Sequence, residues 1–325
     1  MKKMNKKLAS AIVLGLMLAV PVGVSAAEQV ISKDTTFEAG AGNQYTNISG
    51  QTGEESIEFK GMGTSQAFTV NSGVEKSITN IKNINLTGKW STDPYQADAS
   101  VFYTNGENSK LTINISGDLT RNDSDEYAEV FHAMGGDIVV EANSVNIANS
   151  IVGICAQKNS VGASSSINID VEKDVVIKSV STTVYAGTLN QGDVVDGAQS
   201  VVSITAGNDI KLESTSKGGC AVGVYGRDYT TQDPLENQDK VYLKAGNSLK
   251  LKGDNAIFVQ NGIDKDKTAE VTAQGKYISI DGNITAESKG KVTIGGDFKI
   301  DEESISFVKS DITGNIKATD SKIDL

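Results

Sequence analysis

The sequence has 325 residues, a formal net charge of −11, 33 glycines and only three prolines. An acidic chain whose only arginines are Arg121 and Arg227 repels phosphate backbones, which excludes nucleic acid as an expected partner. A single histidine, His132, excludes zinc sites built on several histidines.

The first predicted element is a basic and then apolar segment. Four lysines precede the apolar residues 8–20, and small residues then place a cleavage site after Ala26 or after Ala27. This pattern predicts a secretory signal peptide over residues 1–27, whose removal takes the net charge from −11 to −15. A transmembrane anchor is the alternative, but the apolar stretch is shorter than the ~20 residues that a spanning helix needs.

Residues 28–75 alternate weakly and predict an irregular N-terminal cap or first coil. Residues 76–325 repeat a clearer template: three apolar residues at alternate positions, a polar turn, and two more alternating apolar residues. Clear copies begin at 111, 138, 167, 202, 241 and 271, and a shortened copy covers residues 292–300. Alternation with period two buries one face of a strand. The expected core column of the first strand is Ile113, Val140, Ile169, Ile204 and Leu243.

A second pattern follows most copies and predicts a third strand. Its expected inward column is Val101, Val130, Val152, Val184, Val222 and Ile257. Three short strands per repeat, stacking like on like, predict an all-β fold: a single-stranded, right-handed parallel β-helix. An antiparallel sandwich or barrel is the alternative, and it predicts hairpin turns instead of matched copies.

The Gly-Asn turns at residues 207–208 and 246–247, together with the signal peptide and the strands rich in Ser, Thr and Asn, resemble the passenger regions of bacterial autotransporter adhesins. The resemblance implies a pectin-lyase-like β-helix exported to the cell surface, the outer membrane or the medium. It also implies an outer-membrane β-barrel translocator, which these 325 residues do not contain. Because the template stops mid-strand at 321–325, we expect a fragment or a truncated product.

Residues for catalysis are sparse in this sequence. His132 aligns with strand residues, and no nucleophile elbow surrounds any serine. The acidic groups at 123–126, 264–266 and 301–303 fall in turns and do not recur on consecutive coils, so solvated turns are expected, with adventitious Ca²⁺ or catalysis as alternatives. We expect no catalytic residue, cofactor or metal.

The aromatic residues give the only candidate contact surface. Phe102, Phe131, Tyr185 and Phe258 follow the expected inward column by one residue and should therefore point outward. Long inserted turns add four more candidates: Trp90, Tyr95, Arg227 and Tyr229. A covering insertion or a reversed register is the alternative.

These expectations lead to a non-catalytic adhesin or structural interaction protein, whose partner is a glycan or protein on a host or neighbouring cell. The alternative is a polysaccharide-active β-helix enzyme of the lyase or glycoside hydrolase type. Paired carboxylates on neighbouring coils would favour the enzyme, and a flat polar face would favour the adhesin. Cys155 and Cys220 fall two coils apart, too far for a disulfide, and Cys155 is expected to be the more reactive thiol.

Overall fold

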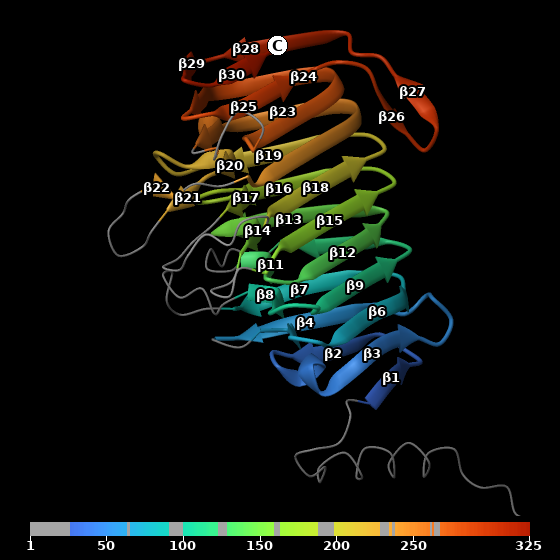
Figure 1. Cartoon of the computed structure of the whole chain (residues 1–325). Helices are drawn as coiled ribbons and strands as arrows, with labels where there is room; N and C mark the ends of the chain where they lie inside the picture. The colour runs from blue at the N-terminus through green and yellow to red at the C-terminus, as the bar shows by residue number, and fades with distance from the viewer. Residues whose placement is uncertain are drawn as a thin grey trace, which may run out of the picture.

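The computed structural model describes residues 27–63, 66–90, 100–122, 129–158, 163–187, 198–227, 234–235, 238–260, 262 and 267–325. Within these residues, 26 strands join one sheet whose pairings are all parallel, and the sheet coils into a solenoid (Figure 1). Each full coil supplies one strand to each of three faces, which we call the first, second and third sheets. The predicted parallel β-helix with three strands per coil is confirmed.

The first sheet contains the opening strand of each coil. Its members are β1 (Ala27–Ile31), β3 (Tyr45–Gly50), β6 (Glu75–Ile81), β9 (Lys110–Ile115), β12 (Asp137–Ala142), β15 (Ser165–Val171), β18 (Ser200–Ala206), the first parts of β23 (Lys240–Gln260) and β24 (Ala269–Glu287), β25 (Gly290–Ile294) and β30 (Lys322–Asp324). The second sheet contains β2 (Thr35–Glu38), β4 (Ile57–Met62), β7 (Ile84–Lys89), β10 (Asp118–Arg121), β13 (Ser144–Ser150), β16 (Val175–Ser179), β19 (Ile210–Ser214), the middle parts of β23 and β24, and β28 (Lys309–Thr313).

The third sheet contains the closing strand of each coil. Its members are β5 (Phe68–Asn71), β8 (Ser100–Asn105), β11 (Glu129–Met134), β14 (Val152–Gln157), β17 (Val184–Gly187), β20 (Cys220–Val224), the last parts of β23 and β24, and β29 (Ile316–Thr319). β23 and β24 each run through all three sheets and bend at register shifts. The only helix among the described residues is the 3-10 turn η1 (Ala41–Gln44).

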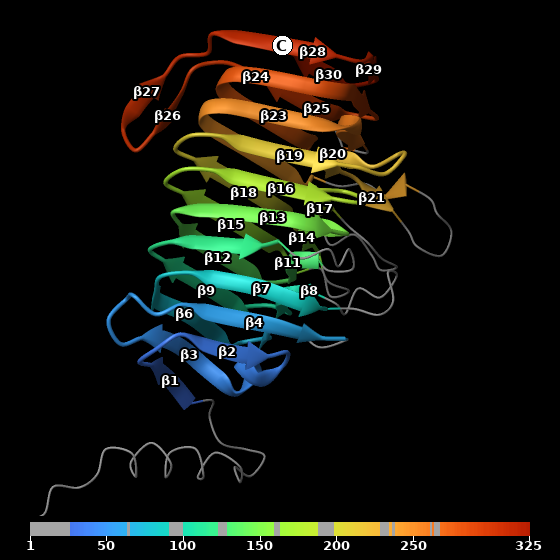
Figure 2. The same ribbon diagram turned by 180° about the vertical axis from the view of Figure 1, so that it is seen from behind.

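The coils wind in a right-handed sense. The chain rises from the N-terminal coil, and the near strands run to the right both in Figure 1 and, seen from behind, in Figure 2. Two antiparallel hairpins leave the stack on opposite sides: β21 (Gly226–Arg227) with β22 (Pro234–Leu235), and β26 (Phe298–Ile300) with β27 (Glu303–Ile305).

The predicted core column of the first sheet is confirmed. Ile113, Val140, Ile169, Ile204 and Leu243 are paired in register across successive coils, and each is 0% exposed. Each column of aliphatic side chains therefore buries the column of the coil above and below it, and this is how a solenoid obtains a core from nearest neighbours alone.

The predicted column of the third sheet is wrong in its N-terminal half. The register joins Phe102, Phe131 and Ile154 to Val184, and from there to Val222 and Ile257. Val101 and Val130 are buried core residues as predicted, at 0% exposure, but they lie on the opposite side of their strands from this column. Val152, two residues before Ile154, is half-buried.

The shortened copy at residues 292–300 is also corrected. Val292 belongs to β25 in the first sheet, as predicted, but Phe298 begins the β26–β27 hairpin. The second-sheet strand of this coil is β28, which pairs with β24. The hairpin is an insertion between the two strands, and its apolar residues imitate the template.

The N-terminal segment is more regular than expected. Residues 27–71 already supply β1 to β5, and β1, β2 and β3 pair in parallel with strands of the next coil. Phe37 stacks on Phe59 with ring centroids 5.7 Å apart. The proposed signal peptide, up to Ala26, lies outside the described residues.

The charged side chain of Arg121 lies on the core side of its strand. Arg121 ends β10, is 0% exposed, and pairs in register with Leu86 and Ile147, which are core positions. A buried guanidinium is tolerated only when it is paired and hydrogen-bonded. Arg121 therefore belongs to the core and contributes nothing to the surface charge.

Candidate functional site

In its middle coils the third sheet differs from the other two because both of its faces are covered from β11 to β20. All the residues of β17 and β20 are buried, and so are four of the six residues of β11. In β12 of the first sheet, by contrast, buried and more exposed positions alternate. We call the side of the third sheet that faces away from the core its outer face; it includes Tyr103, His132, Cys155 and Tyr185.

The expected strip of exposed aromatic residues is wrong. Phe102 and Phe131 are 0% exposed and lie inside the solenoid, where their rings stack 5.6 Å apart. Tyr185 is on the outer face as predicted, but it is only 4% exposed and donates a hydrogen bond to the Tyr225 carbonyl. Phe258 is half-buried.

Of the candidates in the inserted turns, the structure describes only the side chain of Trp90. Trp90 is 1% exposed, so it is a core residue at the end of a strand. Tyr95 and Tyr229 lie outside the described residues, and so does the side chain of Arg227. The inserted turns therefore keep their candidate role only as a prediction.

A cluster of chemically active side chains lies on the outer face of the third sheet, and the sequence analysis did not find it. His132 and Cys155 are register partners in β11 and β14, and Glu129 begins β11. Glu129 Oε2 lies 2.8 Å from His132 Nδ1, and Ser100 Oγ lies 3.0 Å from the same nitrogen. Ligand atoms of Glu129, His132 and Cys155 all lie within 4.8 Å of one another. We call these three residues the Glu–His–Cys cluster.

The two cysteines are free, as predicted, but their predicted difference in reactivity is wrong. Cys155 and Cys220 are both buried. Burial raises the pKa of the Cys155 thiol well above its usual range, and the Glu129 carboxylate adds to the effect. Burial also raises the pKa of Cys220, to about 12. Because the thiolate is the reactive form, neither thiol is activated.

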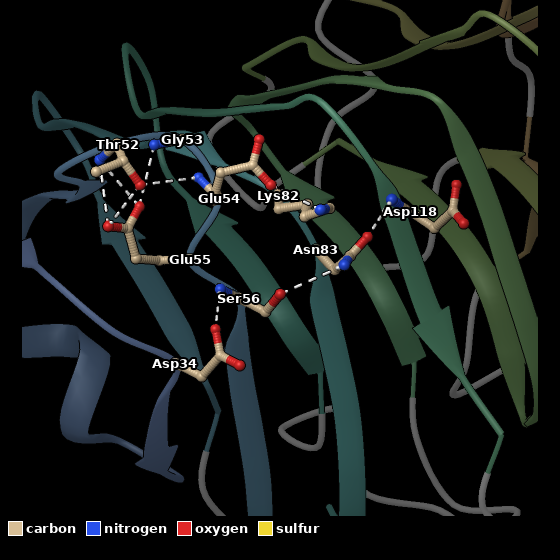
Figure 3. Close-up of polar contacts among 9 residues, drawn as sticks. All are labelled: Asp34, Thr52, Gly53, Glu54, Glu55, Ser56, Lys82, Asn83 and Asp118. Carbon is tan, nitrogen blue, oxygen red and sulfur yellow. Dashed lines mark hydrogen bonds and ion pairs between the residues drawn. The ribbon is translucent and has the colours of Figure 1, made fainter.

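Polar side chains link the coils at the turn between the first and second sheets. In Figure 3, Asp34 accepts a hydrogen bond from the Ser56 backbone at 2.8 Å, Asn83 donates to Ser56 Oγ at 3.3 Å, and the Asp118 backbone donates to Asn83 at 3.0 Å. Later coils repeat these contacts through Asn143, Asn208 and Asn247. This turn ladder satisfies polar groups at the corner and fixes the register of neighbouring coils.

Glu55 accepts hydrogen bonds within its own turn, next to the turn ladder. Thr52 and Gly53 donate backbone hydrogen bonds to its carboxylate, and Lys82 pairs with the neighbouring Glu54 at 2.7 Å (Figure 3). Desolvation raises the pKa of Glu55, but the hydrogen bonds outweigh it, so its pKa lies below the ordinary value. Glu55 therefore acts as a structural acceptor.

An open acidic pocket of about 360 Å³ lies on the first sheet, where the β26–β27 hairpin approaches it. Its lining includes Asn114, Glu141, Asp170, Glu172 and Asp301. Glu141 and Asp170 are register partners on neighbouring coils. Desolvation, Asp301 and Glu141 together raise the pKa of Asp170. The three acidic turn groups considered from the sequence did not include this pair of carboxylates on consecutive coils, which was therefore not identified there.

No family model, no curated protein and no solved structure matches this chain. Among the described residues, none of the helical segments is long and apolar enough to cross a membrane.

Proposed function

We propose that this chain is an exported β-solenoid passenger that acts by binding or by building structure at a cell surface, without catalysis. The observation that supports this best is the outer face of the first sheet. Two columns of mostly polar side chains run along it in register: Thr112, Val139, Asn168, Ser203, Tyr242 and Thr272, and Asn114, Glu141, Asp170, Thr205, Lys244 and Gln274.

Such a face suits the recognition of an extended partner. A parallel solenoid repeats its outward positions about every 4.8 Å, so it offers regularly spaced donors and acceptors over its length. Hydroxyl and amide groups in such an array can hydrogen-bond a polysaccharide or another cell-surface protein. The signal-peptide pattern and the resemblance to autotransporter passengers support the surface location.

Export is tested first. Expression of the full chain in a diderm bacterium should yield a mature form that begins near Ala27, outside the inner membrane. Full-length protein that stays in the cytoplasm would contradict the export part of the proposal. The exported protein is expected to have no catalytic activity. N-terminal sequencing of the exported material checks the cleavage site.

Binding is tested on the first-sheet face. The purified chain should bind bacterial or epithelial cells or immobilised surface glycans. Replacing Asn168 and Ser203 together with Arg should weaken that binding at least tenfold, because two bulky cations interrupt the columns. Lys211→Asp, on an exposed position of the second sheet, is the control and should bind like the wild type. Equal binding by all three proteins would contradict the proposed surface.

A polysaccharide-active enzyme is the second candidate, and the acidic pocket favours it. A carboxyl with a raised pKa beside other carboxylates is the arrangement that a general acid needs. Incubation with pectin, polygalacturonate and glycosaminoglycans, with and without Ca²⁺, should release no reducing ends or unsaturated products if the first proposal is right. Release that disappears in Glu141→Gln and Asp170→Asn would establish the enzyme instead.

A further inference from the structure

The Glu–His–Cys cluster has the geometry of a site assembled by two adjacent coils. β11 and β14 are neighbours in the third sheet, and His132 pairs directly with Cys155. Paired residues of parallel strands lie about 4.8 Å apart and point to the same side. Glu129 precedes His132 by three residues and contacts its Nδ1 atom at 2.8 Å. A carboxylate, an imidazole and a thiol therefore lie close together on the outer face of the third sheet.

His132 is held in one orientation and has an unused nitrogen. Its side chain is 1% exposed, and Nδ1 faces Glu129 and Ser100. Nε2 is buried and has no hydrogen-bond partner among the described residues. Leaving a buried polar atom unpaired costs about 1–3 kcal/mol. Because Nδ1 is the nitrogen that faces Glu129, it is the nitrogen that can share a cation with the Glu129 carboxylate.

We propose that Glu129, His132 and Cys155 bind one thiophilic divalent cation, for which Zn²⁺ is the reference ion. Thiolate, imidazole and carboxylate are the ligand types that zinc takes in proteins. Donor atoms on one tetrahedral zinc ion lie roughly 3–4 Å apart, given metal–ligand distances of about 2.0–2.3 Å. The three groups lie within 4.8 Å of one another, so small side-chain rotations suffice. Ca²⁺ and Mg²⁺ are disfavoured because they require oxygen ligands.

The cluster is largely enclosed, and one of its members reaches solvent. Cys155 is 2% exposed. The Glu129 side chain is 18% exposed and connects the cluster to solvent, whereas His132 and Cys155 are shielded.

The same three residue types could form a thiol nucleophile with its base and orienting carboxylate. A nucleophile must be able to reach its substrate, and Cys155 is only 2% exposed. The metal is therefore the better account. It replaces the expectation that the chain has no metal ligands, which rested on His132 being an isolated strand residue.

Spectroscopy with Co²⁺ and titration with Zn²⁺ test the proposal on the purified, reduced protein. The wild type should bind one Zn²⁺ per chain and gain thermal stability with increasing zinc. The Co²⁺ form should show thiolate-to-metal charge-transfer absorption. Cys155→Ser should abolish this absorption, His132→Gln should weaken zinc binding at least 100-fold, and Glu129→Gln should weaken it roughly 10–100-fold.

Cys220→Ser is the matched control, because Cys220 is also a buried free thiol of the third sheet. It should bind both metals like the wild type. If Cys155→Ser fails to fold, the zinc-induced shift in melting temperature is compared between His132→Gln and Cys220→Ser, and this comparison tests the proposal instead. Charge-transfer absorption that survives Cys155→Ser would assign the metal to Cys220, and zinc binding that is unchanged in His132→Gln would assign it to ligands outside the cluster. Either result would overturn the proposal.

Discussion

The first and third sheets have the same parallel pairing but differ in what lies outside them. In β12 and β15 every second residue is buried and its neighbours are more accessible to solvent. In β14 five of six residues are buried, and in β20 all five are. The first sheet thus has one solvent-exposed side, whereas the third sheet is buried on both sides from β11 to β20.

This difference explains in which strands the alternation of apolar and polar residues predicts the register. A strand with one wet face must alternate, and its register can be read from the sequence. A strand buried on both faces reads as a near-continuous apolar run, and its two sides cannot be told apart. The third sheet also encloses polar groups, which must find partners or a ligand there. The five predictions below test this comparison, from the largest expected effect to the smallest.

Ile204→Asp should be the most damaging change, because it buries an unpaired charge in the first-sheet core. We expect a loss of about 5 kcal/mol or more, seen as a failure to accumulate folded protein. Lys211→Asp, on an exposed position of the second sheet, should melt within a few degrees of the wild type. Equal tolerance of the two changes would show that the register is wrong.

Phe131→Ala should destabilise the chain by about 3–5 kcal/mol, because it removes a ring stacked inside the solenoid. Phe258 is half-buried on the outer side, and Phe258→Ala should cost less than about 2 kcal/mol. Urea denaturation of both variants measures the difference. A larger effect at Phe258 would reverse the assignment of inner and outer sides.

Val130→Asp and Val139→Asp compare the outward sides of the two sheets in two consecutive strands, β11 and β12. Val130 is 0% exposed in the third sheet, and Val139 is half-buried in the first. We expect a loss of about 3 kcal/mol for Val130→Asp and less than about 1 kcal/mol for Val139→Asp. Similar midpoints in urea would contradict the covered outer face.

Asn83→Ala should cost about 1–2 kcal/mol, because it removes the side-chain bonds to Ser56 and to the Asp118 backbone. Asn85→Ala is the control. Asn85 is exposed and accepts one hydrogen bond from Thr120, so its loss should cost less than about 0.5 kcal/mol. Faster amide exchange at the corner in Asn83→Ala alone would locate the effect in the turn ladder.

Asp170→Asn should stabilise the protein slightly, by at most about 0.5 kcal/mol, because Asp170 is exposed and screened by solvent. The pKa of Asp170 is raised in the folded state, so its charged form destabilises the fold at neutral pH. That penalty is relieved as the pH falls through the raised pKa, and the advantage of the variant should then disappear. A stabilisation that persists at low pH would contradict this origin.

Much of the fold follows from the sequence because the repeat is local. The period-two pattern around Ile113, Val140 and Ile169 specifies both the inward face and the match between coils. The turn residues at 207–208 and 246–247 mark the corners in the same way. These features depend on a few consecutive residues, so the sequence of a single coil is enough to predict them.

The sequence by itself determined the solenoid, its three strands per coil and the core of its first sheet. Only the tertiary structure decided that the third sheet is covered on both faces from β11 to β20, that Phe131 points inward, and that Asp301 lies near Asp170. It also decided that Glu129, His132 and Cys155 meet. The physical reason is that insertions of unequal length separate these residues along the chain. Their contacts depend on stacking between coils, which no local pattern encodes.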